Sequence, residues 1–176
     1  MAIITLNNNS LSSVTTLPSG ISGQNYPAFY ARMSTNQVVT DAVTTLIEFD
    51  TEVFDTDSAF NNTATGNGYS FTVPTGKDGK YYIFGRLLMS SGAVDNLEFC
   101  DTSIYVNGSA IGRSSSDFRN NEGLSTTEQK DVILDLTAGD YVQIYGRIGI
   151  NSGTATVIQG SGSRFDSDFG AFRIGD

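Results

Sequence analysis

Acidic side chains that could bind a metal ion gather in two short segments of the chain. One segment carries Asp50, Glu52, Asp55 and Asp57, and in the other Asp166 and Asp168 flank a serine. Carboxylate oxygens are ligands that Ca²⁺ prefers, so these six residues are candidate calcium ligands. The first segment lacks the glycine at the sixth position and the glutamate at the twelfth position that an EF-hand loop needs. A solvated acidic surface is therefore the alternative interpretation, and no other cofactor is expected.

Side chains that could carry out catalysis are scarce. The sequence has no histidine, the commonest general base and metal ligand. Its single cysteine, Cys100, cannot form an intramolecular disulfide and is expected to be a small, partly buried residue. Glycoside hydrolysis needs two carboxyl groups about 5–10 Å apart in a cleft, which acidic residues in one loop do not establish. We therefore expect no catalytic site and no enzymatic activity.

The charge of the chain argues against two classes of partner. Ten lysines and arginines stand against 19 aspartates and glutamates, giving a net charge of −9, and the cations are scattered singly. Proteins that bind nucleic acid or anionic lipid usually present a basic patch, so neither partner is expected. No segment approaches the roughly 20 apolar residues of a membrane span. The first residues also lack the charged start and apolar core of a signal peptide, so no simple secretion is expected.

The elements that must position these side chains are short strands joined by turns. The chain is rich in serine, threonine, asparagine and glycine, and apolar residues alternate with polar ones in many short runs. No pattern of alternating strands and helices is present. The sequence predicts an all-β fold, a jelly-roll β-sandwich of about ten short antiparallel strands. The runs are 28–33, 46–49, 69–73, 80–90, 102–106, 132–136, 141–149, 154–158 and 169–174.

Three of these patterns carry more specific predictions. Residues 80–90 are apolar on both faces, which indicates a central strand or one at a subunit interface. Asn107-Gly108 directly after a strand predicts a tight β-hairpin. The segment 41–47 has helix-like spacing but is too short and β-branched for a helix. Tyr105, Tyr141 and Tyr145 could form a sugar-binding platform, a trimer interface or ordinary sheet packing.

The first 25 residues differ from the rest of the chain. They are polar, with isolated apolar residues about every three positions, and cannot form a core of their own. We predict an extended N-terminal arm over residues 1–25 and the jelly-roll domain over 26–176, with a disordered tail as the alternative. The apolar residues that could dock the arm on another protein are Ile3, Ile4, Leu6, Leu11, Val14 and Leu17.

Several motifs occur in a familiar order between Pro27 and Ile174. They are Ala28-Phe29, Ile47-Glu48-Phe49-Asp50, Phe71-Thr72-Val73-Pro74, Gly79-Lys80-Tyr81, Val106-Asn107-Gly108, Leu136 to Val142 and Phe169 to Phe172. In this order the region resembles the globular head of the complement first component's q subunit, a branch of the tumour-necrosis-factor-like jelly rolls. Extra residues before Gly79, and Ala171 between Gly170 and Phe172, depart from the pattern and indicate a divergent, non-animal member. No Gly-X-Y repeat is present, so the collagen stalk of animal relatives is missing.

The resemblance implies a homotrimer that binds ligands through exposed loops and does not catalyse a reaction. The opening residues, Met1 to Ser10 with the Ser/Thr-rich linker after them, also resemble virion structural proteins of tailed phages of marine bacteria. Together these resemblances imply a short trimeric fibre, spike or capsid decoration protein, assembled in the host cytoplasm and located in the virion. The arm would dock on capsid, tail or other virion proteins, and the jelly roll would face outward towards host carbohydrate or a receptor. The alternative is a free-standing ligand-binding module of lectin-like or cytokine-like type.

Overall fold

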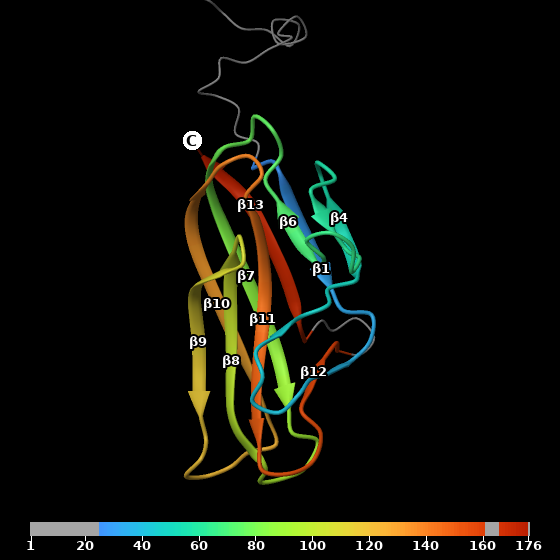
Figure 1. Cartoon of the computed structure of the whole chain (residues 1–176), viewed down its shortest axis with the longest axis vertical. Helices are drawn as coiled ribbons and strands as arrows, with labels where there is room; N and C mark the ends of the chain where they lie inside the picture. Colours follow the sequence, from blue (N-terminus) through green and yellow to red (C-terminus); the bar gives the residue numbers. More distant parts are fainter. Residues whose placement is uncertain (1–24, 161–165, 176) are drawn as a thin grey trace, which may run out of the picture.

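The computed structural model describes residues 25–160 and 166–175 and arranges them in thirteen strands (Figure 1). None of these residues forms a helix, so the described part of the chain holds no helix that could cross a membrane. The strands are β1 (Ala28–Arg32), β2 (Gln37–Val38), β3 (Thr45–Leu46), β4 (Thr51–Asp55), β5 (Phe60–Asn61), β6 (Ser70–Thr72), β7 (Gly79–Ser90), β8 (Leu97–Val106), β9 (Ser109–Asp117), β10 (Ser125–Leu136), β11 (Tyr141–Ile150), β12 (Thr156–Ile158) and β13 (Asp168–Gly175).

The first sheet, sheet A, is built around β7. Its strand order is β2-β12-β7-β13-β1-β4, and β10 pairs along the opposite edge of β7 over residues 125–136. Strand β13 lies between β7 and β1, where Phe169 pairs with Gly85 on one side and Ala31 on the other. Strands β1 and β13, the first and the last of the described chain, are therefore neighbours in the middle of one antiparallel sheet.

The second sheet, sheet B, is built around β11 and β8. Its order is β5-β6-β11-β8-β9, and β3 also pairs with β11. Strands β8 and β9 form the hairpin predicted at Asn107-Gly108. Both turn residues have positive φ angles, +51° and +77°, as a two-residue type I′ turn requires. The long strands of the two sheets run along the longest axis of the molecule (Figure 1).

Aromatic rings fill the core between the sheets. Phe29 stacks on Phe60 and Phe71 with ring centroids 4.7 and 5.0 Å apart, and meets Phe169 edge to face at 4.8 Å. Strand β7 buries every second side chain, among them Tyr81 and Ile83, as its alternation predicts. The predicted all-β jelly-roll sandwich is therefore confirmed.

Several predicted details differ from the structure. The expected strand 46–49 is reduced to β3, although Ile47 and Phe49 are fully buried. The expected strand 69–73 begins only at Ser70, because Tyr69 has a φ of +51° and forms part of a turn. Segment 41–47 is not helical, as expected. The count of about ten strands was too low, mainly because β4, β9 and several two-residue strands carry no apolar alternation.

Candidate functional site

The six candidate calcium ligands are not brought together. Asp50 accepts hydrogen bonds from the amide and hydroxyl of Ser34, and Asp55 accepts them from the amides of Asp57 and Phe60. Glu52 is exposed on β4. In residues 25–160 and 166–175 no group of three or more acidic or cysteine side chains could hold a metal ion. The carboxylates of Asp50 and Asp55 are instead engaged by neighbouring backbone amides and the Ser34 hydroxyl.

Among these candidates only Asp168 is deeply buried, and it belongs to a different arrangement. Its carboxylate forms an ion pair with Arg86 and accepts a hydrogen bond of 3.0 Å from the hydroxyl of Tyr30. Burial raises the pKa of Asp168 above its ordinary value, although both partners oppose this shift. Burial, together with the Asp168 charge, raises the pKa of Tyr30 to about 12. Tyr30, Arg86 and Asp168 therefore hold one another in place on the outer face of sheet A.

The same outer face carries a row of aromatic rings, which we call the aromatic face: Phe54, Tyr30, Phe84, Tyr82 and Phe172. Successive rings in this order lie 6.3, 6.3, 6.0 and 5.3 Å apart, and the row crosses β4, β1, β7 and β13. Ile133 on β10 pairs with Tyr82 and is 61% exposed. Sheet A is therefore apolar on both faces around β7, which lies between β10 and β13 and so has the central position predicted as one alternative for residues 80–90.

A glycine makes room for one ring of the aromatic face. A Cβ atom at Gly170 would lie 2.6 Å from the ring of Phe84, so only glycine lets this ring rest directly on β13. Gly170 itself pairs with Phe84 in the register of β7 and β13. The sequence motif Phe169-Gly170 therefore serves the outer face as well as the core.

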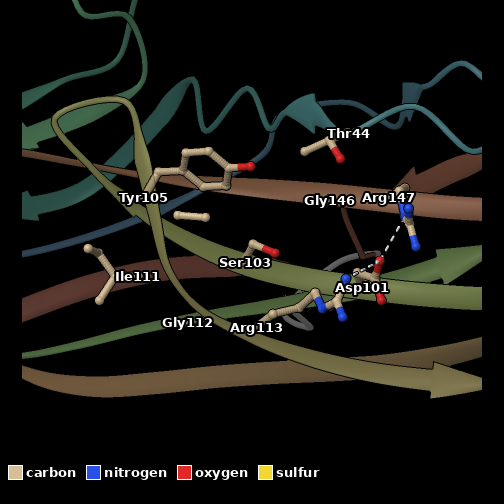
Figure 2. A pocket seen from close by; sticks show the side chains of 10 residues that line it. Thr44, Asp101, Ser103, Tyr105, Ile111, Gly112, Arg113, Gly146 and Arg147 are labelled. Carbon is tan, nitrogen blue, oxygen red and sulfur yellow. Dashed lines mark ion pairs between the residues drawn. The ribbon is translucent and has the colours of Figure 1, made fainter.

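A hollow lies on the opposite side, on the outer face of sheet B (Figure 2). We call it the arginine hollow and define it by Asp101, Ser103, Tyr105, Arg113 and Arg147. Its volume is about 330 Å³. The small Ser103 side chain forms its floor because it lies between larger neighbours: Asp101 and Tyr105 along β8, Arg113 on β9 and Tyr145 on β11. The loop residue Thr44 and the β9 residue Ile111 complete its rim.

One buried carboxylate holds the two arginines of the hollow. The side chain of Asp101 is only 4% exposed, and its Oδ2 atom lies 2.7 Å from Nε of Arg147 and 3.7 Å from Nη1 of Arg113. Its other oxygen accepts a hydrogen bond from the hydroxyl of Ser115. The guanidinium of Arg147 also lies over the ring of Phe99, 4.7 Å from its centroid. The negative charge of Asp101 therefore positions the positive charges of Arg113 and Arg147.

The end of the hollow away from the arginines is aromatic. The rings of Tyr105 and Tyr145 are in contact, with centroids 4.1 Å apart, and Ile111 beside Tyr105 is half exposed. Burial raises the pKa of Tyr145, and the nearby Tyr105 and Tyr141 add to this shift. The tyrosines singled out in the sequence therefore do gather on one exposed sheet face, whereas whether they bind a sugar stays a prediction.

The sequence prediction missed the arginine hollow. Its three charged residues are far apart along the chain and meet only through the strand register. Asp101 pairs with Arg147 on β11. Ser103, two residues further along β8 on the same face, pairs with Arg113 on β9. The signal that could have found them is a lone aspartate inside a strand, since a carboxylate in a sheet requires a partner.

The candidate docking residues Ile3, Ile4, Leu6, Leu11, Val14 and Leu17 lie outside the described residues.

Comparison with known proteins supports the fold and leaves the family open. No family model and no curated protein sequence matches the chain. Among solved structures, the globular domain of zebrafish complement 1qA protein has a TM-score of 0.55 and 17% identity and covers 84% of this chain and 97% of its own. Eiger TNF from S. frugiperda has a TM-score of 0.57 and 11% identity, covering 87% and 95%. Murine APRIL has a TM-score of 0.55 and 11% identity, covering 83% and 97%.

The chain therefore has the jelly-roll fold shared by the complement 1q globular domain and tumour-necrosis-factor-like proteins. This confirms the fold that the resemblance of residues 27–174 implies. The resemblance of the first residues to phage virion proteins is not tested by these comparisons. At such low identity the likeness defines the architecture, and the function must be argued from the two surfaces described above.

Proposed function

We propose that this chain is a non-enzymatic homotrimeric binding module that serves as a structural protein of a tailed-phage virion. In this proposal copies associate through the aromatic face, and the arginine hollow on sheet B remains accessible. The role would be that of a short fibre, a spike or a capsid decoration protein, assembled in the host cytoplasm. The alternative, a free-standing ligand-binding module, shares the trimer and the hollow but does not need the arm.

The aromatic face is the observation that carries the trimer. A row of five rings, ending in the half-exposed Phe54, lies with the exposed Ile133 on the outer face of sheet A of a chain of net charge −9. Exposed apolar side chains grouped in this way mark protein–protein contacts, and aromatic residues are enriched in such contacts. The occupant we propose is a second copy of the chain, because the family resembled by residues 27–174 is typically trimeric.

The virion role is supported by the sequence of the arm. Residues 1–25 combine the resemblance to phage structural proteins with apolar residues at regular intervals, which suit docking along another protein. The absence of catalytic groups fits a module that acts by shape and by several copies binding together. Binding of capsid, tail or other virion proteins through the arm is part of this proposal.

The trimer is tested by measuring the mass of the full chain in solution by light scattering. We expect three copies, and we expect Tyr82→Glu to give a folded monomer because it places a charge in the aromatic face. Val94→Glu is the matched control, since Val94 is exposed in a loop away from this face and its variant should remain a trimer. A monomeric parent chain at all concentrations, or a trimeric and folded Tyr82→Glu variant, would contradict the proposal.

The virion role is tested by deleting residues 1–25. We expect the shortened chain to form the trimer but to be lost from purified particles, because the arm provides the docking contact. A shortened chain that is incorporated as well as the full chain would favour the free-standing module instead.

A further inference from the structure

The arginine hollow combines two different chemical environments within a short distance. The arginines lie at one end, and Tyr105 with Ile111 lies at the other (Figure 2). The arginines are held at Asp101, and Asp101 and Tyr105 are four residues apart along β8, which corresponds to about 13 Å. A ligand that spans the hollow must therefore carry a negative group and an apolar surface more than one sugar ring apart.

The arginine end of the hollow, formed by Asp101, Arg113 and Arg147, has free hydrogen-bond donors that can bind an anion. Both oxygens of Asp101 are already engaged, by Ser115 on one side and by the two arginines on the other. A guanidinium has five N–H donors, so Arg113 and Arg147 keep donors for a ligand after contacting Asp101. The side chain of Arg113 is 58% exposed. With one carboxylate and two guanidinium groups, the hollow carries a net positive charge on an acidic chain.

The charged end is also held in place before a ligand arrives. Arg147 is fixed by Asp101 below it and by the ring of Phe99 beside it, and this ring takes the space left by Gly149, where a Cβ atom would lie 2.1 Å from the ring. A guanidinium held in one orientation loses little entropy when it binds a carboxylate with two parallel hydrogen bonds. A buried aspartate that only positions arginines costs desolvation energy, which is consistent with a binding role.

We propose that the arginine hollow binds a uronic acid residue of an acidic saccharide. Arg113 and Arg147 take its carboxylate, and the apolar C–H face of another sugar residue further along the same saccharide lies against Tyr105. The volume of about 330 Å³ lies within the range of ligand-binding pockets. This inference deepens the proposed function, on which it rests, because it names the ligand class of the outward surface.

The experiment is a calorimetric titration of the full chain at about 0.1 M salt. The probes are trigalacturonate, the neutral galactotriose as its matched control, and inorganic sulfate. We expect saturable binding of trigalacturonate and binding at least about tenfold weaker for galactotriose, which lacks the charge-assisted contact. Absence of trigalacturonate binding would overturn the proposal. Sulfate binding as tight as that of trigalacturonate would overturn it too, since the hollow would then be a general anion site.

Variants separate the two ends of the hollow. Arg113→Gln should weaken trigalacturonate binding about tenfold, whereas Arg119→Gln, an exposed arginine beyond the end of β9, should not change it. Tyr105→Ala should weaken trigalacturonate binding and leave the weak sulfate binding unchanged. Equal effects of Arg113→Gln and Arg119→Gln would contradict the assignment of the site.

Light scattering on the same samples distinguishes this proposal from the function on which it rests. A trimer that does not bind trigalacturonate overturns the saccharide site and leaves the trimer in place. A monomer that binds trigalacturonate overturns the trimer and leaves the saccharide site in place.

Discussion

Cys100 illustrates how burial controls chemistry at the level of one residue. Its side chain is fully buried, and burial, with the nearby charges of Glu128 and Asp101, raises its pKa to about 12. At pH 8 only about one thiol in ten thousand is then a thiolate, the form that reacts. We expect iodoacetamide to leave the folded chain unmodified over hours, as measured by mass spectrometry. The chain unfolded in guanidinium chloride is the control and should take up one label, and rapid labelling of the folded chain would refute this prediction.

Tyr81 predicts how stability changes at high pH. It is fully buried, its hydroxyl donates to the carbonyl of Lys77 at 2.6 Å, and burial raises its pKa to about 12. An unfolded tyrosine ionises near pH 10. The contribution of neutral Tyr81 to the free energy of unfolding is therefore complete below pH 10 and is lost as the pH rises from 10 to 12. Urea unfolding at several pH values should show this decline, and it should be shallower in Tyr81→Phe.

Part of this decline in stability above pH 10 should persist in Tyr81→Phe, because the pKa of Tyr30 is also raised to about 12. The matched control is Tyr26→Phe, in which the altered side chain is exposed at the start of β1. An identical slope in Tyr81→Phe and the parent chain would show that Tyr81 does not contribute.

At the scale of elements, the turn of the β8–β9 hairpin is bonded to the turn that connects β10 in sheet A with β11 in sheet B. Asn107 accepts a hydrogen bond from the amide of Tyr141 at 3.0 Å and donates one to Asp140 at 2.7 Å, which links it to the β10–β11 turn. Gly108 follows with a φ of +77°. Gly108→Ala should therefore lower the free energy of unfolding by about 1 kcal/mol, because alanine is strained at this φ.

The comparison for that prediction is Gly123→Ala. Gly123 has an ordinary φ, and a Cβ atom there would meet nothing within 4 Å, so this variant should not lose stability. Equal effects of the two substitutions in urea unfolding would show that the turn conformation is not what Gly108 provides.

The strands that could be predicted from the sequence are those with an apolar pattern, either alternating or continuous. Strand β7 is apolar on both faces and was found almost to the residue, because its buried side chains are all apolar. Strand β9 was missed because its inward side chains, Ser114 and Ser116, donate hydrogen bonds to the buried Glu128. A polar contact between the sheets leaves no hydrophobic pattern to detect.

The arginine hollow was missed for a related reason. Its charged residues come from three strands, and only the register of β8 with β9 and β11 brings them together. Register depends on the packing of both sheets, so the lone Asp101 in a strand indicates that it needs a partner but not that the partners are Arg113 and Arg147. The aromatic face was partly predictable, since residues 80–90 already showed apolar side chains on both faces.

For the molecule as a whole, the central position of β13 predicts very unequal effects of truncation. Removing residues 161–176 takes away a strand that pairs with both β7 and β1 and buries Phe169 and Ala171. We expect this shortened chain to have no cooperative thermal transition by circular dichroism. The control is a chain lacking residues 1–25, which should unfold cooperatively, because no described strand begins before Ala28.

The pairing of β1 with β13 also has a consequence for how the protein is made. Strand β1 leaves the ribosome early, but its neighbour in sheet A is not available until residue 175 has emerged from the exit tunnel. During translation β1 and β7 expose the edges that β13 will later cover, and these unpaired edges can aggregate. Sheet A therefore closes only after β13 has been synthesised, so chaperones that protect nascent strands should influence the yield of folded protein more than its final stability.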